Sequence, residues 1–148
     1  MKVFYNEAYM APAYAFDTTR KSGEIAAAID EGGAPGCELV DPAGFVGLSE
    51  ELIEATHDPS YVEALRTGEP SDLAESQGFT WDEGIWDMAV NSTAGVLAAV
   101  DEALATGGSS GSLSSGLHHA RRGEGAGYCT VNGLAMAATR ATELVMGT

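Results

Sequence analysis

Apolar residues recur at three- and four-residue steps between positions 86 and 104, and this periodicity constrains the fold more than any other feature of the sequence. The set is Trp86, Val90, Ala94, Leu97, Val100 and Leu104. Such spacing places one apolar stripe along a helix that packs against the rest of the protein. Thr80 and Glu83 have the spacing of a capping box before it, and Gly107-Gly108 ends it. We therefore expect one long amphipathic helix here.

Shorter elements are expected on both sides of this helix. Short apolar runs that favour strands cover Lys2 to Tyr5, Cys37 to Val40 and, with a weaker signal, Ser109 to Leu113. Helical patterns cover the SGEIAAAIDEGG segment with Ser22 as its cap, Leu48 to Thr56, the segment DPSYVEALRTG with Asp58 as its cap, and Asn132 to Met146. The polar stretch from Gly68 to Gly78 is expected to be a mobile surface loop.

Strands that alternate with helices predict an α/β fold, a three-layer αβα arrangement around a parallel sheet. The chain has 148 residues, enough for one domain, so residues 1–148 are expected to form a single domain. Three short strands are few for a parallel sheet that needs helices on both faces. The expected fold is therefore incomplete, with an open sheet edge on its C-terminal side.

The acidic composition bears on partners. A formal net charge of -15, from 22 acidic and 7 basic residues, opposes binding to nucleic acid and to anionic membranes. It attracts cations such as polyamines or basic peptides, but the alternative, that surface acidity serves solubility in salt, is favoured. No apolar run approaches the roughly 18 residues of a membrane span, and no export signal is recognisable. Cys37 and Cys129 lie in dissimilar contexts, which predicts free thiols in the reducing cytoplasm.

One cluster of residues suits proton transfer. His118 and His119 lie between Ser115-Gly116 and Arg121-Arg122, followed by a glycine-rich turn. Imidazoles exchange protons near neutral pH, and glycines let the backbone approach a ligand closely. Two alternatives are a hydrated, exposed His-His loop and a phosphate cradle formed by the arginines with Gly123, Gly125 and Gly127. The cradle is disfavoured because no apolar strand directly precedes it.

Two further residues are less informative. His57 lies between two expected helices, where a single histidine is more often structural than catalytic. Cys129 has no base beside it in the sequence, so it is expected to pack in the core and not to act as a nucleophile.

Taken in order, GLHHARRGEGAGYCTVN resembles the segment that the histone deacetylase and acetylpolyamine amidohydrolase family has as G-x-H-H-A, a short loop and G-[FY]-C-x-x-N. The segments THDPSYVEAL and EGIWDMAVNSTAGVLAAVDEALATG resemble the family's upstream histidine-tyrosine helix and its long helix. Departures are Ser114-Ser115-Gly116-Leu117, where many members have Arg-Pro-Pro-Gly, and Tyr128, where phenylalanine is commoner. The resemblance implies the N-terminal portion of an arginase/deacetylase-like fold.

The resemblance also implies residue roles. Members use a zinc ion and a pair of histidines to hydrolyse amides of acetylated amines, such as acetyl-lysine or acetylpolyamines. By resemblance, His119 is the general base and acid, His118 is its electrostatic partner, and Gly127 and Tyr128 line the tunnel for the acyl group. The family's zinc ligands, an Asp-x-His and a later aspartate, have no counterpart in this sequence. No zinc is therefore expected on this chain alone.

Two hypotheses follow. In the first, the chain is the N-terminal part of a zinc-dependent amidohydrolase and is inactive in isolation. In the second, it is a noncatalytic half-fold module that forms a homo-oligomer or pairs with a complementing chain through the open sheet edge.

Overall fold

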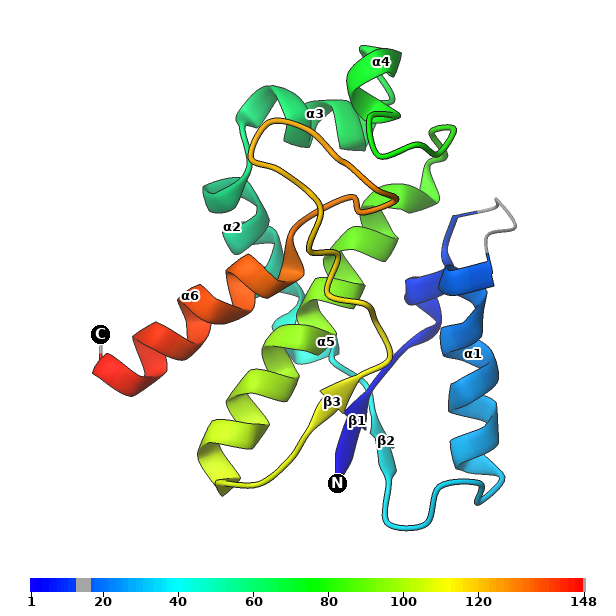
Figure 1. Cartoon of the computed structure of the whole chain (residues 1–148), viewed down its shortest axis with the longest axis vertical. Helices are drawn as coiled ribbons and strands as arrows, with labels where there is room; N and C mark the ends of the chain where they lie inside the picture. The colour runs from blue at the N-terminus through cyan, green and yellow to red at the C-terminus, as the bar shows by residue number, and fades with distance from the viewer. Residues whose placement is uncertain (13–16, 148) are drawn as a thin grey trace.

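The computed structural model describes residues 1–12 and 17–147. Three strands, β1 (Lys2–Phe4), β2 (Glu38–Val40) and β3 (Gly111–Ser112), form a parallel sheet in the order β2-β1-β3. In Figure 1, helices α5 (Gly84–Thr106) and α1 (Asp17–Asp30) flank these strands, with α5 packed on β1 and β3 and α1 packed on β2. The expected α/β class with a parallel sheet is confirmed.

The remaining helices are the short 3-10 helices η1 (Glu7–Met10) and η2 (Ala43–Phe45), and the α-helices α2 (Val46–Thr56), α3 (Pro59–Thr67), α4 (Ser71–Ala74) and α6 (Gly133–Met146). Most of them pack on α5, whereas α4 packs on α3. Among the helices of the described residues, none combines the length and the apolar character that a membrane crossing requires.

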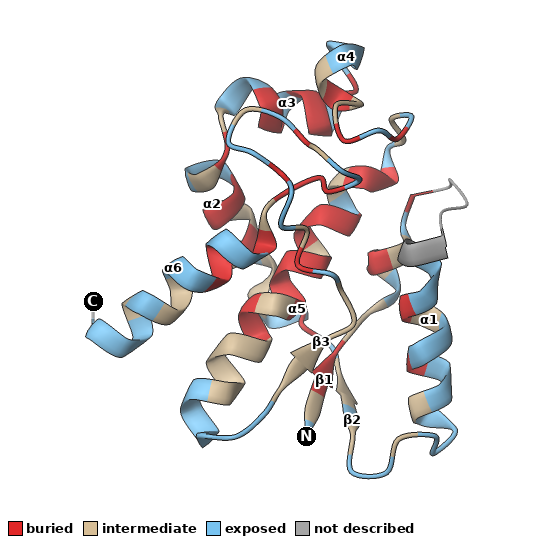
Figure 2. Cartoon of the chain, in the orientation of Figure 1, coloured by how far each residue is buried: buried red, intermediate tan, exposed pale blue. Residues whose placement is uncertain are grey.

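The largest buried cluster lies among helices and not at the sheet. Its fully buried members include Ile53, Tyr61, Leu65, Ile85, Leu97 and Met136, which come from α2, α3, α5 and α6. Figure 2 shows the buried residues concentrated along the middle of α5. Of the predicted stripe, Val90, Ala94 and Leu97 are buried in the core, whereas Leu104 is 46% exposed. The strands are too short to contribute more than a few buried side chains, such as Val3 and Phe4.

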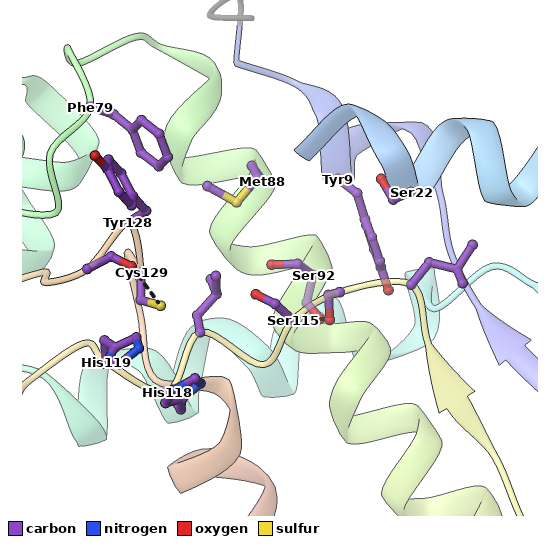
Figure 3. A pocket seen from close by; sticks show the side chains of 14 residues that line it. Tyr9, Ser22, Phe79, Met88, Ser92, Ser115, His118, His119, Tyr128 and Cys129 are labelled. Carbon is purple, nitrogen blue, oxygen red and sulfur yellow. Dashed lines mark hydrogen bonds between the residues drawn. The ribbon is translucent and has the colours of Figure 1, made fainter. Parts of the chain in front are cut away.

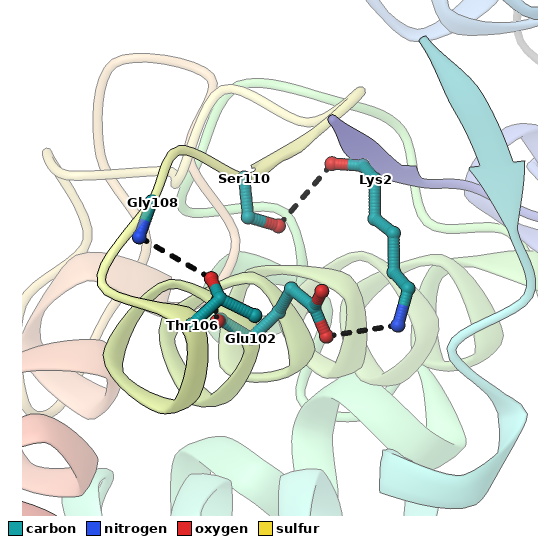
Figure 4. Close-up of polar contacts among 5 residues, drawn as sticks. All are labelled: Lys2, Glu102, Thr106, Gly108 and Ser110. Carbon is teal, nitrogen blue, oxygen red and sulfur yellow. Dashed lines mark hydrogen bonds and ion pairs between the residues drawn. The ribbon is translucent and has the colours of Figure 1, made fainter. Parts of the chain in front are cut away.

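Polar contacts join the first strand to the end of α5 (Figure 4). Lys2 Nζ forms an ion pair with Glu102 Oε2 at 3.0 Å, and Ser110 Oγ donates to the carbonyl of Lys2 at 3.2 Å. The hydroxyl of Thr106 donates to the carbonyl of Glu102 and accepts from the amide of Gly108. Gly107 has a left-handed backbone that ends α5, as predicted.

Several predicted helix starts are wrong. Helix α1 begins at Asp17 and contains Ser22, which is buried and is not its cap. Glu83 occupies the N-cap position of α5, and the carboxylate of Asp82, not the predicted capping box, accepts from the Gly84 amide at 2.8 Å. Asp58 is the N-cap residue of α3, yet its side chain makes no capping bond. Instead, Asp58 Oδ1 accepts from Arg122 Nε.

The segment from Gly68 to Gly78 is also more ordered than predicted. It contains α4 and three buried residues, Gly68, Ala74 and Gln77. The amide of Gly125 donates to Ser76 Oγ at 2.8 Å, and the amide of Tyr128 donates to the carbonyl of Gln77 at 2.9 Å. This segment therefore supports the glycine-rich loop that follows the paired histidines.

Candidate active site

The tandem histidines lie beside a pocket of about 370 Å³. Figure 3 shows its walls, which come from η1, α1, α5 and the long loop between β3 and α6. Apolar atoms form most of the lining surface, and the side chains that contribute them include Phe79, Met88, Leu113, Leu117, Tyr128 and Cys129. Hydroxyl groups from Tyr9, Ser22, Ser92, Ser114 and Ser115 are also part of it, together with His118, His119 and Gly127. The pocket thus suits an apolar group with a polar end.

His118 and His119 are both exposed and lie at the rim with their rings close together. The ring centroids are 4.0 Å apart, and the ring planes are inclined by 40°. Leu117, directly before them, has a left-handed backbone with φ 53°, an uncommon conformation for a non-glycine residue. That turn places both imidazoles along one side of the pocket, where they can reach a bound group.

Gly127 lies directly against the ring of His119. Its backbone is left-handed, with φ 54°, and a Cβ added there would lie 3.1 Å from His119 Cγ. Only glycine lets the chain pass the imidazole at this distance without strain. The structure therefore brings together His119 and Gly127, which the sequence predicted for the same site.

Tyr128 forms the outer wall of the pocket. Its backbone is left-handed, with φ 63°, and its ring lies 5.4 Å from the ring of Phe79, centroid to centroid. Tyr128 is 55% exposed and lies beside Phe79 at the pocket (Figure 3). A ring at this place can cover the alkyl part of a substrate.

Asn132 organises the backbone around the histidines, a role that the sequence did not predict. Its Nδ2 donates to the carbonyls of His118, at 3.2 Å, and of Ala120, at 3.0 Å. Its Oδ1 accepts from the amide of Ala135 at 3.0 Å and so caps α6. The sequence signal was an asparagine directly before a helical pattern, which indicates a cap but gives no hint of the two carbonyls.

His57 is buried and bonded at both ring nitrogens, which agrees with its structural interpretation. Nδ1 lies 3.2 Å from the carbonyl of Arg122, and Nε2 accepts from the backbone amide of Asn132 at 3.1 Å. The neighbouring Tyr61 donates from its hydroxyl to the carbonyl of Thr130 at 2.6 Å. Burial is the main cause that lowers the pKa of His57, so the neutral imidazole is favoured.

The arginines beside the histidines are engaged with carboxylates. Arg121 pairs with Glu124 at 3.0 Å, and Arg122 Nε donates to Asp58 Oδ1 at 2.8 Å. Both pairs are exposed to solvent and contribute little to stability. Because each guanidinium already faces a carboxylate, this arrangement disfavours the phosphate cradle that was considered from the sequence.

Cys129 is buried, as predicted, and it also lines the pocket. Its Sγ donates weakly to the carbonyl of Gly127 at 3.6 Å. Both cysteines are free thiols.

Sequence reasoning did not identify the pocket residues contributed by distant elements. Tyr9 comes from η1 and donates to Ser112 Oγ or accepts from it at 2.9 Å, while Met88 and Ser92 come from α5. A Cβ on Gly95 would collide with the Tyr9 hydroxyl, so this glycine allows η1 to approach α5. No local pattern marks these residues, because only the fold brings them to the pocket.

Across residues 1–12 and 17–147, no group of three or more His, Cys, Asp or Glu side chains is arranged to hold a metal ion. The described residues therefore do not fit the zinc site that the family resemblance implies. His118 and His119 alone offer two imidazoles, fewer than the three protein ligands that catalytic zinc takes.

Comparison with known proteins agrees with the motif. The family model described as "Histone deacetylase domain" matches residues 19–146. An uncharacterized protein from Picosynechococcus sp. is 31% identical over 86 residues, which are 57% of this chain and 28% of that relative. The match thus spans little more than a quarter of the relative's length.

Proposed function

The chain belongs to the histone deacetylase domain family, and from this premise we propose that it contributes the tandem histidines and one wall of the acyl tunnel to an amidohydrolase site. The substrate class is an acetylated amine, either acetyl-lysine or an acetylpolyamine. In isolation the chain is expected not to turn over its substrate, because the described residues include no group of three or more side chains that could hold a metal ion. Location in the cytoplasm stays a prediction, which subcellular fractionation tests.

One observation carries this proposal: His119 packs on Gly127 at the rim of an apolar pocket whose outer wall is Tyr128. The pocket can cover the alkyl part of an acetylated amine while the amide group of that substrate lies beside the imidazoles. The exposed rings of His118 and His119 are accessible to water and to a leaving amine. Geometry therefore supports proton transfer at an amide better than it supports phosphate binding.

The proposed roles concern proton transfer and orientation. His119 takes a proton from the attacking water and returns it to the amine nitrogen when the C–N bond breaks. His118, whose ring centroid lies 4.0 Å from that of His119, is its electrostatic partner beside the attacking and leaving groups. Gly127 and Tyr128 orient the chain that carries the amide. Zinc chemistry, which the family uses to polarise the carbonyl, needs ligands that the described residues do not provide.

The charge of the chain supports a cationic substrate. A formal net charge of -15 raises the local concentration of polyamines and of basic peptides. Acetylation neutralises one amine, and the remaining positive charges of such a substrate are still attracted to the acidic surface.

The test measures zinc per chain and hydrolysis of an acetyl-lysine reporter, first on the isolated chain and then after co-expression with the complementary part of a family domain that carries the metal ligands. We expect no zinc and no turnover alone, and turnover in the reconstituted complex. His119→Ala should lower that turnover by about 10²-fold or more, as expected for loss of a general base. Glu63→Gln, an exposed change on α3, serves as the control that should leave it unchanged.

Two results would contradict the proposal. Equal turnover of His119→Ala and the unchanged complex would remove His119 from the chemistry. One tightly bound zinc per isolated chain, lost in His118→Ala, would show that these imidazoles are metal ligands instead of proton carriers.

Two separate features favour the second candidate function, a half-fold module that associates with another copy. β3 is an edge strand of the sheet, and the end of α6 exposes Leu144, Val145 and Met146, with Val145 72% exposed. Unpaired strand edges and exposed apolar side chains favour association. Sedimentation of the chain and of Val145→Lys tests this: a dimer that becomes a monomer supports the module, and a monomer throughout contradicts it.

A further inference from the structure

The loop that carries the tandem histidines is held at two points by one side chain. His57, at the end of α2, contacts the carbonyl of Arg122 through Nδ1 and the amide of Asn132 through Nε2. These partners lie 65 and 75 positions away in the sequence, on the two arms of the glycine-rich loop. A single imidazole therefore ties both arms of the loop to the junction between α2 and α3.

The two bonds fix the protonation state of His57. A backbone amide can only donate, so Nε2 must be the unprotonated nitrogen that accepts from Asn132. A carbonyl can only accept, so Nδ1 must carry the proton that it donates to Arg122. The imidazolium has no acceptor and would direct a second N–H at the Asn132 amide. Both contacts together are compatible only with the neutral ring in its Nδ1–H form.

Asn132 connects this contact to the tandem histidines. Its side chain donates to the carbonyls of His118 and Ala120, the residues on either side of His119. When the Asn132 amide is held by His57, its side chain bridges the backbone on both sides of the proposed general base. Loss of the His57 contact therefore reaches His119 through one residue.

We propose that His57 is a positioning residue of this site: its neutral imidazole holds Asn132, and through Asn132 the backbone of the tandem histidines, and protonation of the ring releases them. The relevance of His119 to amide hydrolysis rests on the proposed function, whereas the loop geometry does not. The test therefore measures hydrogen-exchange protection in the loop and not turnover, so that failure of either proposal can be recognised separately.

The groups around His57 determine the direction of the pH effect. Burial is the largest effect and lowers the pKa of His57, and the charge of Arg122 also lowers it. The backbone contacts with Arg122 and Arg121 and the charge of Asp58 raise it. The net result is a lowered pKa. Tyr61 presents its ring edge at 5.7 Å between centroids and carries no charge near neutral pH. Since the pKa of the folded state lies below the ordinary value of about 6.5, the loop is held near pH 8. The contact is lost as the pH falls through the lowered pKa of His57 in the folded state.

The experiment measures hydrogen-exchange protection factors by NMR at the Asn132 backbone amide, relative to the Leu97 amide in α5, between pH 8 and pH 5. We expect this ratio to fall in the wild-type chain by about fivefold to tenfold toward pH 5, as for the loss of one hydrogen bond. His57→Gln can place an acceptor where Nε2 lies and has no titrating group, so its ratio should stay high and constant. His57→Asn reaches only the Nδ1 position, so its ratio should be low at every pH.

Ser49→Ala is the matched control for general destabilisation. Ser49 is buried on the same helix and donates to the carbonyl of Val90 at 2.8 Å, away from the loop. Its ratio should follow the wild-type pH dependence. A wild-type ratio that is constant from pH 8 to pH 5 overturns the proposal even without any variant. Equal loss in Ser49→Ala and His57→Asn near pH 8 overturns it as well, because His57 would then only add stability.

Discussion

Single backbone conformations shape the candidate site at the scale of the residue. Leu117, Gly127 and Tyr128 all have a left-handed backbone, and two of them are not glycine. Such conformations cost on the order of 1 kcal/mol or more for a non-glycine residue and persist where surrounding contacts determine them. The contacts of Tyr128 include the hydrogen bond from its amide to the carbonyl of Gln77 and the ring of Phe79. The site is therefore held by contacts from elsewhere in the chain.

Gly127→Ala tests whether the left-handed backbone beside His119, the proposed base, shapes the site. We expect a loss of about 1 kcal/mol from backbone strain, and in addition a displacement of the His119 ring, which lies 3.1 Å from the added Cβ. Urea denaturation measures the first effect, and the NMR shifts of the His119 ring measure the second.

Gly107→Ala is the control for that change. Gly107 has a similar left-handed backbone, with φ 66°, but nothing lies within 4 Å of an added Cβ. It should lose comparable stability and leave the His119 shifts unchanged. Equal shifts of His119 in both variants would mean that Gly127 has no specific role beside the ring.

Helix α5 is the element on which the fold depends. Its buried face packs on α2, α3 and α6, while its outer turns form ion pairs such as Asp101 with Arg140, whose side chains are each 24% exposed. Apolar burial should therefore outweigh charge pairing in the stability of this helix.

Leu97→Ala and Asp101→Asn compare these two contributions. Leu97 is fully buried, so truncation should lower the free energy of unfolding by about 2–5 kcal/mol. Asp101→Asn weakens a partly exposed ion pair and should cost no more than about 1 kcal/mol. Urea denaturation of both variants checks the order, and a larger loss for Asp101→Asn would contradict it.

The sequence predicted the elements better than their ends. The stripe from Trp86 to Leu104 identifies α5, and Asn132 is the cap of α6 as its sequence position indicates. Ser22 and the Thr80–Glu83 pair were wrong as helix starts, because caps depend on which neighbours compete for the side chain. Asp58 illustrates this: it has the right position, but its carboxylate accepts from Arg122 instead.

At the scale of the whole molecule, net charge acts on the fold as a unit. A formal charge of -15 on 148 residues makes the folded chain repel itself. Raising the salt concentration from about 0.01 M to about 1 M shortens the Debye length from roughly 30 Å to roughly 3 Å. The melting temperature, followed by circular dichroism, should therefore rise with NaCl. A falling melting temperature would mean that the exposed ion pairs matter more than the net repulsion.

The site as a whole was only partly predictable. His118, His119, Gly127 and Tyr128 lie within one short stretch, so a motif could identify them together. Tyr9, Phe79, Met88 and Ser92 belong to other elements, and their place in the pocket follows from how η1 and α5 pack. The support of His57 for the loop likewise depends on contacts between residues far apart in the sequence.

The central claim is that the pocket beside the tandem histidines accepts an acyl-amine chain. Titration of the ¹⁵N-labelled chain with a peptide containing Nε-acetyl-lysine, and with the same peptide unacetylated, tests it most directly. The unacetylated peptide has one more positive charge, so it controls for attraction to the acidic surface. We predict saturable shifts at Phe79, Gly127 and Tyr128 with the acetylated peptide alone. Equal shifts with both peptides, or shifts only outside the pocket, would contradict the claim.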